Sequence, residues 1–126
     1  MLEEKFLALG DRLVENDGAA VRALLGEIAT LLDAHVALED ERLYPPLERK
    51  AEAAGEKSTL ILARSFQGGM AVITGALDRL VARQRMASTF NADDFAHEWN
   101  TVLHALRSRI HAEEASLYPI YRRLVR

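Results

Sequence analysis

One acidic phrase occurs twice in this chain, and its repetition limits what the chain can fold into. The first copy is Glu39-Asp40-Glu41-Arg42-Leu43-Tyr44-Pro45, and the second is Glu113-Glu114-Ala115-Ser116-Leu117-Tyr118-Pro119. Each copy comes late in a long segment whose apolar residues recur at helical spacing. Four residues before the first acid stands His35 in one copy and Arg109 in the other. The repetition predicts a duplicated helical hairpin whose two halves bring their carboxylates together.

Apolar spacings of three and four residues predict helices over residues 2–14, from 19 to the prolines at 45 and 46, 58–85, and from 95 onward. Asn16-Asp17-Gly18 should end the first helix. Pro45-Pro46 should end or kink the second, because proline lacks a backbone donor. We expect a polar connection from Glu48 to Lys57 and an N-cap at Ser58.

The two halves also correspond outside the repeated phrase. Corresponding apolar positions are Val21 and Phe95, Leu25 and Trp99, Ile28 and Val102, Leu32 and Leu106, and Val36 and Ile110. One hairpin cannot bury both of its apolar stripes alone, so two hairpins should stack. The predicted fold is all-α: an antiparallel up-down-up-down four-helix bundle built from two repeated hairpins, with a short first helix. A chain of 126 residues should form this as a single domain over residues 1–126.

Composition narrows the function classes. The formal net charge is −3 and no basic patch is visible, which argues against binding to nucleic acid or to a membrane surface. The chain has no cysteine, so thiolate metal sites and iron–sulfur clusters are excluded. We expect no membrane-spanning run and no signal peptide, because the N-terminal residues are acidic. The expected location is the cytoplasm.

Three polar side chains should point into the bundle. Helical projection places Glu39 and Glu113 within the apolar stripes, with His35 close to the centre of its own. An unpaired buried charge is costly, so these residues need a reason to be there. A metal ion could neutralise them, Arg109 could pair with a glutamate, or water could reach this end of the bundle. The metal-ligand candidates are therefore His35, Glu39 and Glu113.

A second set of polar residues looks like a ladder but should face solvent. His97, His104 and His111 are seven residues apart, and Tyr118 continues the series. Projection places them opposite Trp99 and the rest of the apolar stripe. Residues seven apart lie about 10 Å apart along a helix, too far to share one ion.

The phrase His35-x-x-x-Glu39-Asp40-x-x-Leu43-Tyr44-Pro45, with its second copy from Glu113 to Pro119, resembles the hemerythrin-like (HHE cation-binding) domain over essentially the whole chain. The resemblance implies a four-helix bundle; the best-known members hold two irons and bind dioxygen reversibly. It assigns His35, Glu39 and Glu113 to the metal site.

This chain departs from the family pattern at several ligand positions. Arg109 stands where the second histidine should be, and a guanidinium stays protonated and cannot bind a metal. The helix expected over residues 58–85 offers only Phe66, Gly69 and Met70 at that level, and the first helix contains no histidine. The five-histidine, two-carboxylate di-iron centre therefore cannot be built from this chain.

The first helix should also stop short of the site, because its 13 or 14 residues span only about 21 Å. Leu38, Leu43 and Leu47 should then be partly exposed, and a second copy of the chain could cover them in a homodimer. Alternatively, the native start lies upstream of Met1, together with a missing histidine.

Two functions remain open at this stage. One is a structural, sensing or interaction module that carries no oxygen, is no enzyme and fills its site with an Arg109–carboxylate salt bridge. The other is a protein that binds iron or zinc at a reduced site of His35, Glu39 and Glu113, completed by water or by groups from a partner chain. No catalytic residues are predicted.

Overall fold

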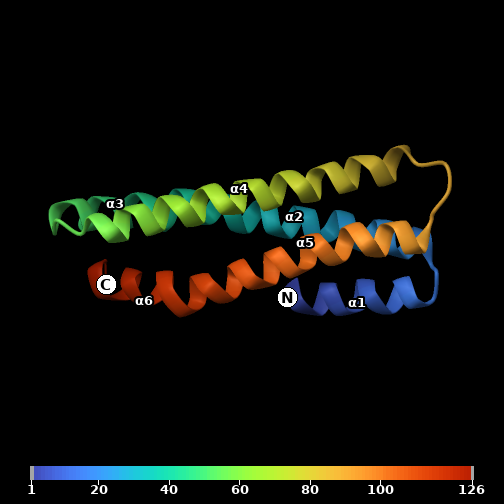
Figure 1. Ribbon diagram of the computed structural model, residues 1–126, viewed down its shortest axis with the longest axis horizontal. Helices are drawn as coiled ribbons and strands as arrows, with labels where there is room; N and C mark the ends of the chain where they lie inside the picture. Colours follow the sequence, from blue (N-terminus) through green and yellow to red (C-terminus); the bar gives the residue numbers. More distant parts are fainter. Residues whose placement is uncertain (1, 126) are drawn as a thin grey trace.

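Figure 1 shows the computed structural model, which describes residues 2–125; all regular elements within that range are helical. In chain order they are α1 (Leu2–Val14), α2 (Gly18–Arg42), α3 (Tyr44–Ala53), α4 (Lys57–Met86), α5 (Ala92–Ala112), the π-helical η1 (Glu113–Leu117) and α6 (Tyr118–Leu124). In Figure 1, α3 extends α2 and α6 extends α5, so four helical rods lie side by side. The expected all-helical chain of four helices is confirmed.

Helix α1 packs at one end of the bundle only. It contacts α2 and α5, and the N label in Figure 1 lies about midway along the molecule. Phe6 of α1 meets Trp99 of α5 edge-on, with 6.0 Å between ring centroids. Phe6, Leu9 and Trp99 are all buried there. The first helix is thus short, as the sequence predicts, and leaves the other half of the α2–α5 side without a cover from α1.

Short polar side chains fix where two helices begin. Asp17 caps α2, and its side chain accepts a 3.1 Å hydrogen bond from the Ala20 backbone N–H. Asn91 caps α5 in the same way through the Asp94 N–H, at 3.0 Å. Such caps satisfy backbone donors that have no partner within the helix. The turn before α2 also contains Asn16 with φ of 57°, a left-handed conformation that asparagine tolerates well.

The predicted polar connection from Glu48 to Lys57 is wrong over most of its length. Helix α3 continues to Ala53 and leaves only residues 54–56 as a link, and the cap of α4 is Glu56 rather than Ser58. Pro45 and Pro46 lie in the first turn of α3, where a missing backbone N–H costs little. The prolines end α2 and at the same time start α3.

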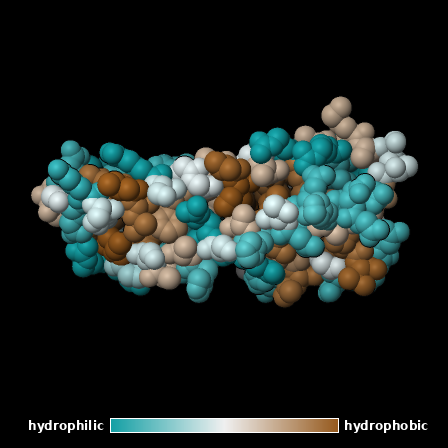
Figure 2. Space-filling view, viewed as in Figure 1, coloured by the Kyte–Doolittle hydropathy of each residue, from teal (hydrophilic) through white to brown (hydrophobic). Residues whose placement is uncertain are grey.

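The expected exposure of Leu43 and Leu47 is also wrong. Both are buried in a second apolar cluster that α3 forms against α4 and η1, with Tyr44, Phe66 and Leu117 among its other members. Figure 2 shows hydrophobic side chains gathered between α4 and α6 in this half of the molecule. Leu38 is 48% exposed, so the prediction holds for that residue alone.

The two copies of the repeated phrase have different backbones. After Glu39, the Leu43 N–H bonds the Glu39 carbonyl in the ordinary α pattern, at 2.9 Å. After Glu113, the Glu113 carbonyl instead accepts from the N–H of Tyr118, five residues on. A π-helical turn holds more residues than an α-turn, so it rotates every side chain that follows it. Pro119, which cannot donate a backbone hydrogen bond, comes directly after this turn.

Helix α4 is the one helix among the described residues that is long and apolar enough to cross a membrane, by length and composition alone. No such run was expected from the sequence. In the structure this helix packs against α2, α3 and α5, and Phe66, Met70, Ile73, Leu77 and Leu80 are buried in the bundle.

Candidate metal centre

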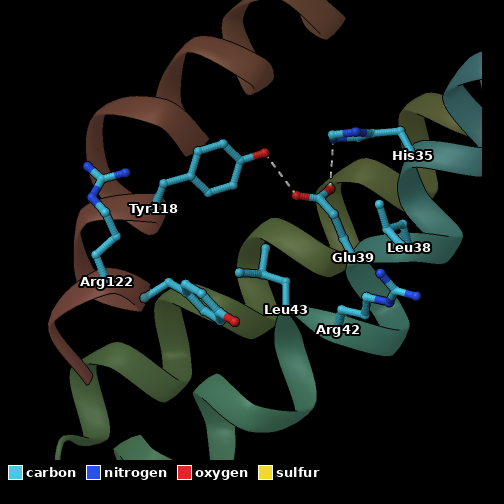
Figure 3. A pocket seen from close by; sticks show the side chains of 8 residues that line it. His35, Leu38, Glu39, Arg42, Leu43, Tyr118 and Arg122 are labelled. Atoms are coloured by element: carbon cyan, nitrogen blue, oxygen red, sulfur yellow. Dashed lines mark hydrogen bonds and ion pairs between the residues drawn. The ribbon is translucent and has the colours of Figure 1, made fainter. Parts of the chain in front are cut away.

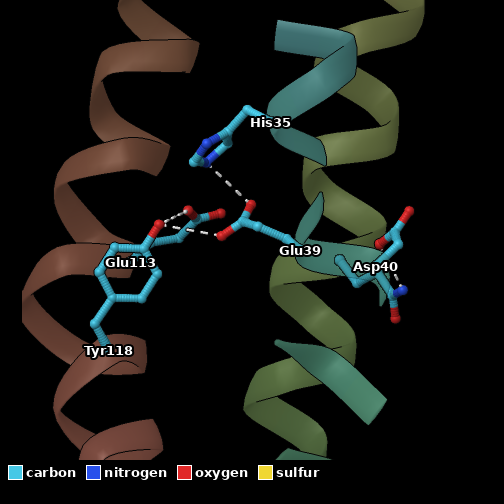
Figure 4. A network of polar contacts seen from close by, with 6 residues as sticks. His35, Glu39, Asp40, Glu113 and Tyr118 are labelled. Carbon is cyan, nitrogen blue, oxygen red and sulfur yellow. Dashed lines mark hydrogen bonds and ion pairs between the residues drawn. The ribbon is translucent and has the colours of Figure 1, made fainter. Parts of the chain in front are cut away.

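Three polar side chains from two distant segments meet at the level of η1. His35 and Glu39 lie one turn apart on α2, and Glu113 is the first residue of η1. One ligand atom from each of the three lies within 4.8 Å of the other two. His35 Nε2 is 3.2 Å from Glu39 Oε1. The structure thus brings together all three predicted ligands, and Figure 4 shows them facing one another between α2 and η1.

Only the first acid of each acidic pair faces this site. Asp40 lies on the side of α2 away from Glu113, and its Oδ1 accepts a 2.9 Å hydrogen bond from Gln67 Nε2. Glu114 is exposed to solvent. The successive acids differ because neighbouring helical residues point about 100° apart.

Tyr118 joins the two carboxylates, and sequence reasoning missed it. Its hydroxyl lies 3.1 Å from Glu39 Oε2 and 3.3 Å from Glu113 Oε2. The phenol can donate only one hydrogen bond. Both contacts are therefore full hydrogen bonds only when Glu113 is protonated and donates its own proton to the Tyr118 hydroxyl oxygen. Burial, followed by the charges of the two glutamates, raises the pKa of Tyr118.

The expectation that Tyr118 continues the solvent-facing series is therefore wrong. The π-helical turn at Glu113–Leu117 reduces the rotation per residue between His111 and Tyr118 and carries the phenol inward. The three histidines of that series, His97, His104 and His111, are exposed as expected. The signal that could have found Tyr118 is the tyrosine at the same place in both copies of the phrase, since Tyr44 also lies near the glutamates.

Glu113 is the most strongly perturbed acid of the site. Its side chain is 0% exposed, and Oε1 has no hydrogen-bond partner among the described residues. Burial raises the pKa of this carboxyl to about 7, and the negative charge of Glu39 adds to the rise. A buried carboxylate oxygen without a partner is costly in the charged form, and a bound cation would satisfy it.

His35 forms the half-exposed edge of the site. Its hydrogen bond to Glu39 raises the pKa of the imidazole, partial burial opposes that rise, and the charges of both glutamates support it. The His35 imidazole and the Glu113 carboxyl therefore hold protons at a pH where each group alone would have released them. Metal ligands must be deprotonated, so an ion would compete with these protons.

Comparison with known families decides which kind of domain carries this site. Residues 1–121 match the family described as the hemerythrin HHE cation binding domain. The chain belongs to this family. No curated protein and no solved structure matches the chain significantly.

The hemerythrin-family site is incomplete in this chain, because the side chains facing the triad from the other helices are not metal ligands. At the level of the site α4 presents Phe66 and Met70, both apolar and buried, and Gly69, which has no side chain. The described residues of α1 lie along the other half of the bundle and do not extend to this level. Among residues 2–125, the three residues of the triad form the one cluster that could hold an ion. One imidazole and two carboxylates suit a single iron or zinc ion and do not suffice for a pair.

Arg109, which replaces the expected second histidine, does not neutralise the glutamates. Its guanidinium lies over the Phe66 ring, with Cζ 5.1 Å from the ring centroid. No salt bridge joins it to Glu39 or Glu113 within the described part of the chain. A Cβ atom at Gly69 would come within 2.7 Å of the Arg109 Cζ, so the glycine makes room for the guanidinium on α4. The predicted Arg109–carboxylate salt bridge is wrong, because the aromatic ring and the missing side chain offer Arg109 another place.

Proposed function

We propose that this hemerythrin-family domain binds one iron or zinc ion through His35, Glu39 and Glu113. The observation that carries the proposal is the convergence of three ligand atoms within 4.8 Å around a carboxylate oxygen that has no other described partner. An imidazole with two carboxylates is a donor set that iron and zinc accept. Water or groups from a partner would occupy the remaining coordination positions.

The competing role is a metal-free structural or interaction module. That role depended on Arg109 balancing the glutamates, and the guanidinium instead lies against Phe66. Protonation of Glu113 and His35 is then the way in which the metal-free site avoids an excess of buried charge. The two functions therefore differ in one measurable property, which is whether a metal displaces those protons.

We further propose that the domain carries no dioxygen and catalyses no reaction, and that its role is sensing, interaction or structure. Support comes from the donors among residues 2–125, which form a single three-residue cluster and so suffice for one ion rather than a pair. We also infer that the two halves are copies of one hairpin in an up-down-up-down bundle. The equivalent positions of Glu39 and Glu113 in the two copies of the phrase support this duplication.

Metal analysis of the purified protein tests the proposal. Protein prepared without chelators and incubated anaerobically with Fe²⁺, or with Zn²⁺ in a parallel sample, should retain about one equivalent per chain after gel filtration. The double variant His35→Ala/Glu113→Gln should retain almost none. A matched control is His104→Ala, which removes an exposed histidine of α5 and should leave the metal content unchanged.

Two results would reject the proposal. One is less than about a tenth of an equivalent of any transition metal in the wild-type protein under conditions where the ligands are deprotonated. The other is equal retention by the wild type and the double variant, which would place the ion elsewhere on the surface.

A further inference from the structure

A cleft of about 350 Å³ opens beside the glutamates, on the side that α1 does not reach. Residues of α2 form one wall, and residues of α6 form the other (Figure 3). The lining residues are His35, Leu38, Glu39, Arg42, Leu43, Tyr118, Tyr121 and Arg122. This volume lies at the lower end of the range typical of small-molecule sites.

The walls of this cleft are mostly apolar. Leu38 and Leu43 contribute aliphatic surface from α2 and its end, and Tyr121 contributes an aromatic ring from α6. Leu38 is 48% exposed although it lies on the side of α2 that faces the cleft. Covering such apolar surface in a concave site with a ligand removes it from water, which favours binding.

Two positive charges flank the same cleft. Figure 3 shows Arg42 on the α2 side and Arg122 on the α6 side. Within residues 2–125 neither guanidinium forms a salt bridge with an acid. The one acid in the lining, Glu39, is only 7% exposed, and its two oxygens contact His35 and Tyr118. The charge presented at the mouth is therefore positive.

The size of the exposed apolar surface favours a small molecule over a second copy of the chain. A stable protein–protein interface buries about 800 Å² on each partner. Burial of Leu43 and Leu47 leaves Leu38 as the one strongly exposed large aliphatic residue of the cleft. A second chain would gain little there, whereas a molecule with a short apolar body and an acidic group would match both the walls and the arginines.

We propose that this cleft binds a small organic carboxylate with an apolar body. The carboxylate meets Arg42 or Arg122, which lie on opposite walls in Figure 3, and the apolar body covers Leu38, Leu43 and the ring of Tyr121. Guanidinium groups suit this task because they form charge-assisted, often bidentate, hydrogen bonds with carboxylates. The site adjoins the metal ligands but uses separate residues for its charge recognition, so it does not depend on a bound ion.

Octanoate is a suitable probe, with octanol and octylamine as uncharged and cationic counterparts of the same length. In calorimetric titrations of the metal-free protein, octanoate should bind with a Kd of about 1 mM or tighter. Amide shifts in NMR spectra should change most around Leu38 and Tyr121. Octanol and octylamine should bind at least tenfold more weakly, because neither brings a negative charge to the arginines.

A charge-matched pair of variants locates the binding. Arg42→Gln/Arg122→Gln should weaken octanoate binding at least tenfold. Arg49→Gln/Arg64→Gln removes the same charge at two exposed positions outside the cleft and should leave the Kd unchanged. Circular dichroism spectra of both variants should match the wild type, since all four side chains are exposed.

Three results would overturn the proposal. The first is no saturable octanoate binding at several millimolar. The second is equal binding of octanoate and octanol, or equal weakening in both double variants, since either would remove the role of Arg42 and Arg122. The third is light scattering that shows a dimer which Leu38→Asp dissociates, since a second copy would then occupy the cleft.

Discussion

Replacing Glu113 with glutamine should stabilise the metal-free protein at alkaline pH. The side chain is fully buried, and its pKa is raised from 4.5 to about 7. A rise of roughly 2.5 units at 1.36 kcal/mol per unit corresponds to about 3 kcal/mol of penalty for the charged form. Glutamine keeps the shape and the hydrogen-bond acceptor without the charge, so most of that penalty should disappear.

The sign of the pH dependence follows from the direction of this shift. The folded protein holds the Glu113 proton up to about pH 7, whereas the unfolded chain releases it near its ordinary value of 4.5. The folded state therefore binds more protons between these limits, and the free energy of unfolding falls as the pH rises through them. Glu113→Gln and wild type should be nearly equal in stability at pH 4.5 and differ most above pH 7.

Urea denaturation followed by circular dichroism, in EDTA at pH 5 and pH 8, measures the difference. At pH 8 the variant should be more stable by about 2–3 kcal/mol. This corresponds to a Tm roughly 10 °C higher for a chain of this size. The matched control is Glu114→Gln, which removes the neighbouring exposed carboxylate and should change stability by less than about 0.5 kcal/mol.

Adding metal should reduce or reverse the difference in stability between wild type and Glu113→Gln. An ion at a hundred times its Kd stabilises the wild type by about 2.7 kcal/mol, while the variant has lost one of its three ligands. A variant that is less stable than wild type at pH 8 in EDTA would refute the reasoning, because the ionised carboxylate would then be held favourably. A stability difference that does not change with pH would refute it equally.

Three further predictions concern the neighbours of this carboxylate. Arg109→Ala should lower the free energy of unfolding by about 1 kcal/mol, the value of a cation–π contact with its packing. A loss above about 3 kcal/mol in urea denaturation would mean that the guanidinium balances the charge of the glutamates. Tyr118→Phe should lower the free energy of unfolding by about 1.5–3 kcal/mol, because the Tyr118 hydroxyl contacts both carboxylates. The control is Tyr121→Phe, whose hydroxyl has no partner among residues 2–125, and it should lower this free energy by less than about 1 kcal/mol. Zinc affinity should rise between pH 6 and pH 8, because zinc must displace protons from Glu113 and His35, whose pKa values are both raised. Calorimetry in buffers of different ionisation enthalpy should detect the released protons. A zinc affinity that is independent of pH would contradict this prediction.

Local periodicity was sufficient to predict the four main helices and the convergence of His35, Glu39 and Glu113. The residues between Leu2 and Val14 form the first helix as predicted, because regular apolar spacing and a clear break define a helix without long-range information. His35, Glu39 and Glu113 come together because each lies on the buried stripe of its helix at an equivalent place in a repeated phrase. These inferences depend on which way a residue points along one regular helix.

Features that depend on tertiary packing could not be predicted from the periodicity of a single helix. Leu43 and Leu47 are buried because a polar-looking segment continues as a helix and packs against α4. Arg109 turns to Phe66 because a glycine on another helix leaves room for it, which no property of its own helix indicates. Tyr118 points inward because the backbone changes its hydrogen-bond pattern one turn earlier.

The homodimer and the cytoplasmic location remain predictions. With Leu43 and Leu47 buried, the apolar surface available to a second copy is smaller than the sequence implied. Gel filtration with light scattering at two protein concentrations would test the dimer, and a constant monomeric mass would reject it.

The five residues that begin at Glu113 also matter to anyone who transfers information between relatives of this chain. An alignment column assigned by counting along an uninterrupted α-helix will place Tyr118 and everything after it on the wrong side of the domain. An attempt to rebuild a two-metal centre here by copying ligands from the first repeat into the second would meet the same error beyond this point. The wider turn would have to be kept, or removed deliberately, before any such graft is designed.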